Sequence, residues 1–279
     1  MSLSVQAFDY LRNLVRTKSG IVLEAGKEYL VESRIGGLVR QSGLASIDEL
    51  VERLKSSSVD PLHRRVVEVM TTNETSFFRD GHPFDVLRTH VLPALMTARS
   101  STRQLNFWCG ACSTGQEPYT VAMTMLESVP RLAEWKISFL CTDLSSEMVA
   151  RCRAGTYSAT EIGRGLPPAL LNKYFDKTGT EWQAKKLLRD MMTVKELNLT
   201  QAWPQMQPVD IIFLRNVLIY FDTNTKKDIL GRCRKLLKPD GYLYLGSAET
   251  PMSLDEEYER LPVDRSGCYR KKQSTVRAA

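Results

Sequence analysis

Apolar residues recur at helical spacing through the first seventy residues of the chain. The stretch 5–17 places its apolar side chains on one face and is followed by a serine and a glycine, which are typical helix-end signals. Further helices are predicted over 27–41 and over 46–54, where Ser46 opens a capping box. A fourth begins at Asp60-Pro61. Four short helices predict a small N-terminal bundle.

From about Leu105 the pattern changes to apolar strands that alternate with helices. This alternation predicts an α/β fold with a mostly parallel sheet. Strands are predicted at the start of 106–118 and over 136–142, 209–214 and 242–246, with a helix over 224–237, a turn at 238–241 and closing strands within 258–269.

The periodicity weakens between residue 166 and residue 200. A short helix is predicted from Leu166 and a turn at 177–180, and 187–194 fits either one strand or a strand pair. We interpret this stretch as an inserted β-hairpin subdomain. The predicted organisation is therefore a helical domain over 1–75 and an α/β domain over 76–279 that carries the insert.

Composition places the chain among ordinary globular proteins. It has 279 residues, of which 43% are hydrophobic and 25% charged. No apolar stretch approaches the roughly 18 residues that span a bilayer, and the first residues lack the apolar core of a signal peptide. We expect a cytoplasmic protein without membrane insertion.

The cysteines and the net charge say little about which kind of site or partner the protein has. Six cysteines are scattered through strand-like and helical segments, which does not suit a disulfide framework. Cys109 and Cys112 have metal-ligand spacing but no second Cys or His pair to complete a site, so no metal is expected. The net charge of +6 suits either nucleic acid or an acidic protein partner and does not choose between them.

The run 106–118 carries the clearest functional signal. An apolar strand enters a turn of small residues, and a helix follows with Pro118 at its start. Such a strand–turn–helix arrangement lets a ligand lie against backbone that no large side chain covers, at a helix N-terminus. A phosphate loop needs Lys and Ser or Thr after its last glycine, but Gln116 and Glu117 stand there. Glu117 attracts an ammonium group, so S-adenosylmethionine fits; a dinucleotide and a turn without a ligand remain alternatives.

A second carboxylate follows the next predicted strand. Asp143 stands directly after 136–142 and before a predicted helix. In open α/β sheets an acidic residue at this position binds the ribose hydroxyls. We therefore expect Asp143 to hold the ribose, the alternative being a helix cap.

Three further polar segments are candidates for the same site. Residues 71–79 offer hydroxyls, an amide and Arg79, which can neutralise a carboxylate; the alternative is a linker that caps helices. Arg215 and Asn216 follow the strand 209–214, where open sheets place their sites, and Tyr220 comes four residues later. The alternatives are a turn cap at Asn216 and a core role for Tyr220. Asn198-Leu199 is the third segment, or simply the end of a hairpin strand.

Taken in order, the segments 71–79, 109–119, 141–143, 198–199 and 215–222 resemble those of the chemotaxis receptor methyltransferases, the CheR-type protein-glutamate O-methyltransferases. The resemblance covers nearly the whole chain, including the helical domain and the insert. It implies a Rossmann-like S-adenosylmethionine-dependent sheet. The implied reaction is methyl transfer to glutamate side chains on the cytoplasmic helical bundle of methyl-accepting chemoreceptors, with S-adenosylhomocysteine as product.

The resemblance also assigns roles to individual residues. Arg79 and Tyr220 would face the reacting methyl group. The cofactor site would be lined by Asn73, Thr75, Arg79, Glu117, Asp143, Asn198, Leu199, Arg215 and Asn216.

The chain departs from the family pattern in two places. Gln116 stands where relatives often have Glu, but the neighbouring Glu117 remains, so cofactor binding is expected to survive. Some members grip a tethering pentapeptide at the receptor terminus through a glycine-rich loop, whereas 176–182 is short and holds one glycine. No strong dependence on such a tether is expected.

Two other functions remain open on the residues alone. The basic excess suits an RNA methyltransferase of the same fold, although no nucleic acid is expected as partner. A cofactor-occupied scaffold that binds signalling proteins without turnover is the second alternative.

Overall fold

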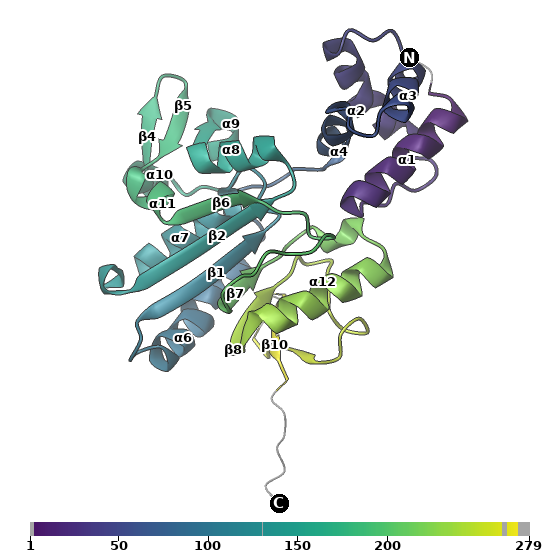
Figure 1. The fold of residues 1–279 in the computed structure, drawn as a ribbon. Coiled ribbons are helices and arrows are strands. Elements are labelled where there is room, and N and C mark those ends of the chain that lie inside the picture. Colours follow the sequence, from purple (N-terminus) through teal and green to yellow (C-terminus); the bar gives the residue numbers. More distant parts are fainter. Residues whose placement is uncertain (1–2, 130, 264–266, 273–279) are drawn as a thin grey trace, which may run out of the picture. The chain divides into compact units, whose positions relative to one another are not determined.

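The computed structural model describes residues 3–129, 131–263 and 267–272. The chain forms two compact units. One consists of Met1–Thr72 and Tyr220–Thr225, and the other of Asn73–Ile219 and Lys226–Ala279. The smaller unit therefore uses two separate segments of the chain. Figure 1 shows the elements of both.

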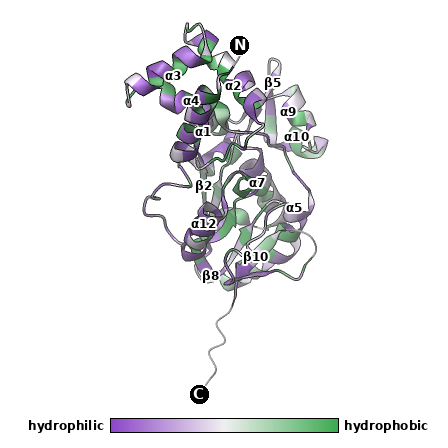
Figure 2. Ribbon diagram, turned by 90° about the vertical axis from the view of Figure 1, so that its right-hand side faces the viewer, coloured by the Kyte–Doolittle hydropathy of each residue, from purple (hydrophilic) through white to green (hydrophobic). Residues whose placement is uncertain are grey.

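The smaller unit is helical, as predicted. Its helices are α1 (Val5–Ser19), α2 (Glu28–Gln41), α3 (Ile47–Ser56) and α4 (Leu62–Met70). Ser4 caps α1, and the Ser46 hydroxyl accepts the Glu49 N–H at 3.1 Å. The Glu49 carboxylate accepts the Ala45 N–H instead of that of Ser46, so only half of the predicted capping box forms. Each helix turns an apolar face inward and a polar face outward (Figure 2).

The larger unit is built on a seven-stranded sheet in the order β6-β2-β1-β7-β8-β10-β9. The first five strands pair in parallel, and β10 and β9 close the sheet antiparallel. This confirms the predicted α/β class. The strands are β1 (Gln104–Gly110), β2 (Lys136–Asp143), β6 (Met192–Glu196), β7 (Val209–Phe213), β8 (Leu237–Tyr244), β9 (Tyr258–Arg260) and β10 (Cys268–Lys271).

Helices cover both faces of this sheet. Helices α6 and α7 lie on one face and α12 on the other (Figure 1). The helices of this unit that flank the sheet are α5 (His82–Val86), a π-helical turn (Leu87–Val91), α6 (Leu92–Ala98), α7 (Gln116–Ser128), α8 (Ser146–Ala154) and α12 (Thr223–Leu236, whose first residues group with the helical unit), with single 3-10 turns at Leu132–Glu134 and Leu218–Tyr220.

A second, three-stranded antiparallel sheet has the order β3-β5-β4. Its strands and the short helices near it are β3 (Thr156–Ser158), α9 (Ala159–Gly163), α10 (Pro168–Tyr174), β4 (Phe175–Thr178), β5 (Glu181–Ala184) and α11 (Lys186–Asp190). The hairpin β4–β5 matches the predicted insert, and its turn holds Gly179 at φ 62°.

Two sequence interpretations are wrong in detail. Residues 187–190 are helical, and the strand that follows, β6, pairs in parallel with β2 in the main sheet instead of within the insert. The stretch 238–241, predicted as a turn between helix and strand, lies inside β8. It forms an irregularity there, because Val209 pairs with Leu237 but Ile211 already pairs with Tyr242.

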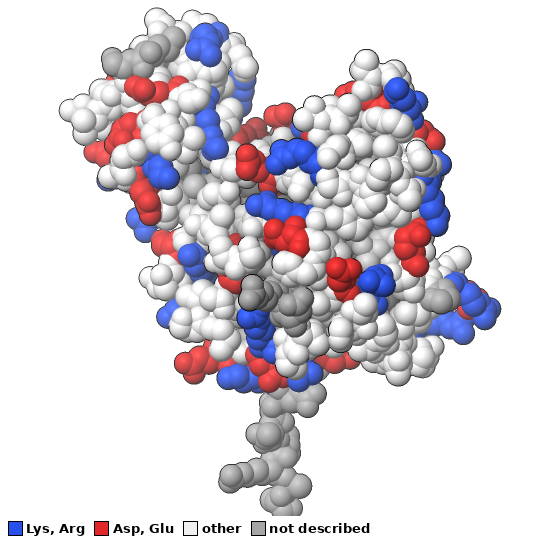
Figure 3. Space-filling view, turned by 180° about the vertical axis from the view of Figure 1, so that it is seen from behind, with Lys and Arg blue, Asp and Glu red and all other residues white. Residues whose placement is uncertain are grey.

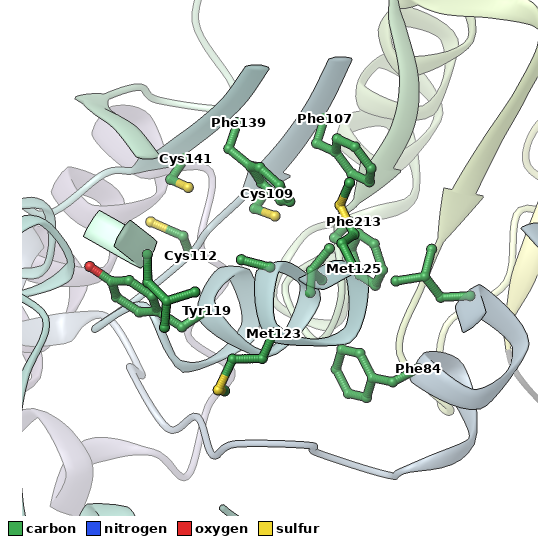
Figure 4. Packing of buried hydrophobic residues seen from close by; sticks show 14 of the residues in the cluster. Phe84, Phe107, Cys109, Cys112, Tyr119, Met123, Met125, Phe139, Cys141 and Phe213 are labelled. Carbon is green, nitrogen blue, oxygen red and sulfur yellow. The ribbon is translucent and has the colours of Figure 1, made fainter. Parts of the chain in front are cut away.

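The core of the larger unit lies between the sheet and α7. Helix α7 is almost wholly buried, and Figure 4 shows Met123 and Met125 of this helix among aromatic side chains. Phe107 and Phe139 stack at 4.5 Å between ring centroids. Such dense apolar packing fixes α7, and with it the loop that precedes the helix.

A buried carboxylate holds the opposite end of the sheet, where β7 begins. Asp210 is fully buried and accepts the Asn106 N–H at 2.8 Å. It also pairs with Arg99 and Lys238, each at 2.8 Å. This cluster lies at the amino end of the strands, away from the edge where α/β sheets place their sites.

No helix among the described residues combines the length and the apolar character that a bilayer crossing requires.

Candidate functional site

The loop between β1 and α7 has an unusual backbone. Ala111, Ser113 and Gly115 all have positive φ, at 52°, 50° and 97°. At Gly115 a side chain has no room, because an added Cβ would lie 2.8 Å from the Cys152 sulfur. Helix α7 begins at Gln116, so Pro118 is its third residue and not its first, still within the turn that needs no donor there. The loop thus presents small residues and bare backbone next to a helix N-terminus.

Asp143 lies at the carboxyl end of β2, beside this loop. It is 6% exposed, and its carboxylate accepts the Ser113 N–H at 2.8 Å and the Ser145 N–H at 3.0 Å. Ser145, not Asp143, caps α8 by accepting the Met148 N–H. Each carboxylate oxygen keeps acceptor capacity beyond one bond, so hydroxyl groups can still bind there.

A buried ion-pair cluster lies at the start of α7. The Arg215 side chain is 1% exposed and donates to Glu117 at 2.5 Å and to Asp80 at 2.7 Å. It also donates to the Arg79 carbonyl at 3.1 Å and lies over the Phe84 ring. Its Nε is buried and has no partner among the described residues. The guanidinium of Arg215 therefore joins two other predicted site residues, Glu117 and Arg79, and also Asp80, which was not predicted.

Burial changes the protonation of both acidic residues. Desolvation raises the pKa of Glu117 above its ordinary value, and the Arg215 pair and the charge of Arg79 offset only part of this effect. Desolvation also raises the pKa of Asp143, against the backbone N–H groups of Ser145 and Ser113. Both carboxylates would gain from a ligand that brings positive charge or hydroxyl donors.

The segment before α5 is held in place by the same cluster. Phe78, Asp80 and Gly81 have positive φ at 49°, 68° and 59°. Arg79 is half-buried and donates to the Glu74 carbonyl at 3.0 Å. Among the described residues no carboxylate forms an ion pair with Arg79, so its charge stays available to a ligand.

The start of this segment contacts the β1–α7 loop. The Ser113 hydroxyl donates to the Asn73 carbonyl at 2.8 Å, which links Asn73 through Ser113 to Asp143. Thr75 follows two residues after Asn73 in the same segment and is half-buried.

Asn198 and Leu199 follow β6, the strand next to β2. Leu197 donates its N–H to the Asp143 carbonyl at 2.9 Å, which brings this stretch to the end of β2. The Leu199 carbonyl accepts Arg232 at 2.8 Å, and Leu199 is 7% exposed. The Asn198 side chain accepts the Thr200 N–H and hydroxyl.

Asn216 follows Arg215 in a turn with φ 59°. Its N–H donates to the Glu249 carboxylate at 2.7 Å. Tyr220 ends a 3-10 turn and groups with the helical unit, where its carbonyl accepts the Val22 N–H at 2.9 Å. The predicted catalytic role of Tyr220 therefore stays a prediction.

Sequence reasoning missed two acidic residues of this region, Asp80 and Glu249. Glu249 stands five residues after the end of β8, so the argument that singled out Asp143 after β2 would have pointed to it as well. Asp80 follows Arg79 directly, but nothing in the sequence indicates that it pairs with an arginine 135 residues away.

All six cysteines are free and buried. Figure 4 shows Cys109, Cys112 and Cys141 in the core beside α7. Among the described residues, no group of three or more His, Cys, Asp or Glu side chains is arranged to hold a metal ion.

Comparison with known proteins decides the family. The model of the CheR methyltransferase S-adenosylmethionine-binding domain matches residues 73–266, and that of the CheR all-alpha domain matches 6–71. The chain belongs to the CheR methyltransferase family. It is a methyltransferase of the chemotaxis class with S-adenosylmethionine as its cofactor.

Relatives of this CheR family member match over nearly its full length. Chemotaxis protein methyltransferase 1 of Pseudomonas aeruginosa is 40% identical over 98% of this chain and 100% of that protein. A chemotaxis protein methyltransferase of Pseudomonas putida is 40% identical over 90% and 93% of the two chains, and one of Escherichia coli is 32% identical over 92% and 89%.

The described residues fit this cofactor. Glu117 is a largely buried carboxylate in the first turn of α7, and Asp143 is a buried carboxylate at the carboxyl end of β2. The 111–115 loop connects β1 to α7, and its Ser113 N–H donates to Asp143. The orphaned Nε of Arg215 shows that the cluster has unused donor capacity. In this CheR domain, Glu117 would pair with the cofactor's ammonium group and Asp143 would bind the ribose hydroxyls.

Proposed function

We propose that this CheR family member transfers methyl groups to glutamate side chains on the cytoplasmic helical bundle of methyl-accepting chemoreceptors, which gives glutamyl methyl esters. The observation that carries the proposal is the Arg79 guanidinium, which forms no ion pair with a carboxylate among the described residues and whose charge acts on the largely buried Glu117. Arg215 is already committed to two carboxylates, so Arg79 is the cation that suits an incoming anionic side chain.

The reaction asks little of a general base. A glutamate with an ordinary pKa of about 4.3 is ionised at neutral pH and attacks without losing a proton. Bound S-adenosylmethionine supplies the methyl group and leaves as S-adenosylhomocysteine. Arg79 would hold the acceptor carboxylate, and Tyr220 would orient it or shield the methyl group.

Glu117, Asp143, Asn73, Thr75 and Asn198 would bind the cofactor in this proposal. Leu199, Arg215 and Asn216 complete the set. The contacts that link Asp143 to Ser113, and Ser113 to Asn73, support a shared pocket.

The helical domain, predicted as 1–75, would recognise the receptor helices by packing and charge complementarity. Acceptor helices of this kind would be reached from the cytoplasm, which is where this proposal has the enzyme act. The turn between β4 and β5 holds only Gly179 and Thr180 beyond the paired residues, which supports the expectation that a receptor pentapeptide is not needed as a tether. Tight binding of such a peptide in titration calorimetry would contradict this.

An RNA methyltransferase of the same fold is the weaker alternative. On the face drawn in Figure 3, Lys and Arg side chains of the described residues are interspersed with Asp and Glu and form no continuous basic stripe.

The test follows the label from radioactive S-adenosylmethionine. Membranes that contain candidate chemoreceptors are incubated with the enzyme, and the methylated protein is then treated with mild base. Glutamyl esters release volatile labelled methanol. Base-stable label in added RNA would support the RNA alternative, and no label in either would support a scaffold without turnover.

A further inference from the structure

Glu249 makes an unusual set of contacts for a carboxylate outside the proposed pocket residues. The residue is 7% exposed. One of its oxygens accepts the N–H groups of Asn216 and Gly246, both at 2.7 Å. The other accepts those of Leu218 at 2.7 Å and Ile219 at 3.3 Å. Four backbone donors from two loops thus converge on one side chain.

Glu249 is the acceptor that the structure gives to these four backbone N–H groups. Buried N–H groups without an acceptor are costly, and the turn at Asn216 is held at a φ of 59° that non-glycine residues rarely adopt. A carboxylate provides about four acceptor positions, which matches the four donors. A glutamine at the same place offers acceptors on one atom only and turns an NH₂ group toward the other pair.

The two loops, Asn216–Ile219 and Gly246–Glu249, also lie close together. An added Cβ at Gly246 would lie 2.6 Å from the side-chain Nδ2 of Asn216 and 2.8 Å from a Glu249 oxygen. Gly246, the second residue after β8, therefore leaves room for the turn that carries Asn216, which a side chain would not. The turn directly follows Arg215, whose guanidinium reaches Glu117 and Asp80.

We propose that Glu249 is a positioning residue for cofactor binding: by holding the Asn216–Ile219 backbone, it places Arg215 and Asn216 for the S-adenosylmethionine pocket. This inference rests on the proposed cofactor site. Glu249 itself need not touch the cofactor. Its charge also contributes to raising the pKa of Glu117, after the larger effect of desolvation.

A purely structural role predicts something different. Asp210 is a matched control, because it is a buried carboxylate of the same sheet that also accepts a backbone N–H, but at the opposite end of the strands. If Glu249 only stabilises the fold, Glu249→Gln and Asp210→Asn should affect cofactor binding alike. If Glu249 positions the pocket, only the first should weaken binding.

The experiment measures the dissociation constant of S-adenosylhomocysteine by titration calorimetry and the urea midpoint on the same full-length samples. We expect Glu249→Gln to raise the dissociation constant about tenfold, the loss of one hydrogen bond to a charged group. Asp210→Asn should lower the urea midpoint but keep the wild-type dissociation constant. Gly246→Ala, whose added Cβ pushes against both Asn216 and the Glu249 carboxylate, should raise the dissociation constant as well.

Asp143→Ala is included to separate this inference from the proposed site. Loss of binding in Asp143→Ala together with wild-type binding in Glu249→Gln would overturn the positioning role and leave the site intact. Equal weakening in Glu249→Gln and Asp210→Asn would also overturn it. Wild-type binding in Asp143→Ala would overturn the site, and the role of Glu249 with it.

Discussion

The ion pair between Arg215 and Glu117 should be among the strongest electrostatic couplings in the larger unit. Both side chains are largely removed from water, at 1% and 14% exposure, and they meet at 2.5 Å. Two unit charges about 4 Å apart in an effective dielectric of about 20 attract by about 4 kcal/mol. After allowance for partial exposure of Glu117 we expect a coupling energy of about 2–3 kcal/mol.

The measurement is a double-mutant cycle at pH 7. The variants are Arg215→Met, Glu117→Gln and the double variant, and the free energy of unfolding comes from urea denaturation followed by circular dichroism. Each single change leaves one buried group without its partner, so the double variant should lose less stability than the sum of the two.

Two further cycles calibrate the result. The Asp80 side chain is 32% exposed, so its coupling to Arg215 should be smaller, about 1 kcal/mol. The surface pair of Arg88 and Asp85 lies at 3.4 Å with both side chains more than half exposed, and it should couple by less than about 0.5 kcal/mol. A coupling between Arg215 and Glu117 no larger than that of the surface pair would refute the reasoning.

Three other predictions follow from the same region. Arg79→Ala should lower turnover at saturating cofactor by more than tenfold, because a charge-assisted contact to the acceptor is lost, while the affinity for S-adenosylhomocysteine changes less. A fall in that affinity with normal turnover would contradict the role of Arg79 toward the acceptor. Gly115→Ala should cost about 1–3 kcal/mol of unfolding free energy, because the φ of Gly115 is 97° and Cys152 blocks the added Cβ. Gly179→Ala also has a positive φ but open space around it, so it should cost less. Equal losses in urea denaturation would refute the steric contribution of Cys152. Burial raises the pKa of Glu117, so its contribution to stability is full below its unfolded pKa of about 4.3 and is lost as pH rises through the folded value. The unfolding free energy of the wild type relative to Glu117→Gln should therefore fall as pH rises from about 4. A difference that stays flat or grows with pH would contradict the raised pKa.

Local sequence patterns were sufficient for most of the fold. The helices of the smaller unit and the parallel strands could be predicted, because their apolar positions repeat with a clear period. The run 187–194 has apolar pairs at 187–188 and 191–192 and no clear period, so the helix α11 and the edge strand β6 could not be told apart. The irregularity within β8 depends on pairing with β7, which no local pattern records.

Some residues of the candidate site could likewise be predicted from local sequence, whereas their contacts could not. Asp143 could be singled out because position relative to a strand end is a local property of the sequence. The partners of Arg215 could not, because Glu117 is 98 residues away and Asp80 is 135 residues away, and their pairing depends on tertiary packing. The convergence of four backbone N–H groups on Glu249 is likewise visible only once two loops meet.

The helical unit is assembled from two separate stretches of chain, since 220–225 belongs with the first 72 residues. Arg16 pairs with Asp222 at 3.0 Å, and Val22 donates to the Tyr220 carbonyl. A chimera that exchanges the N-terminal segment with that of a relative would therefore separate these partners. Transplanting both stretches together preserves them, and this is the practical rule for exchanging the helical unit between members of the family.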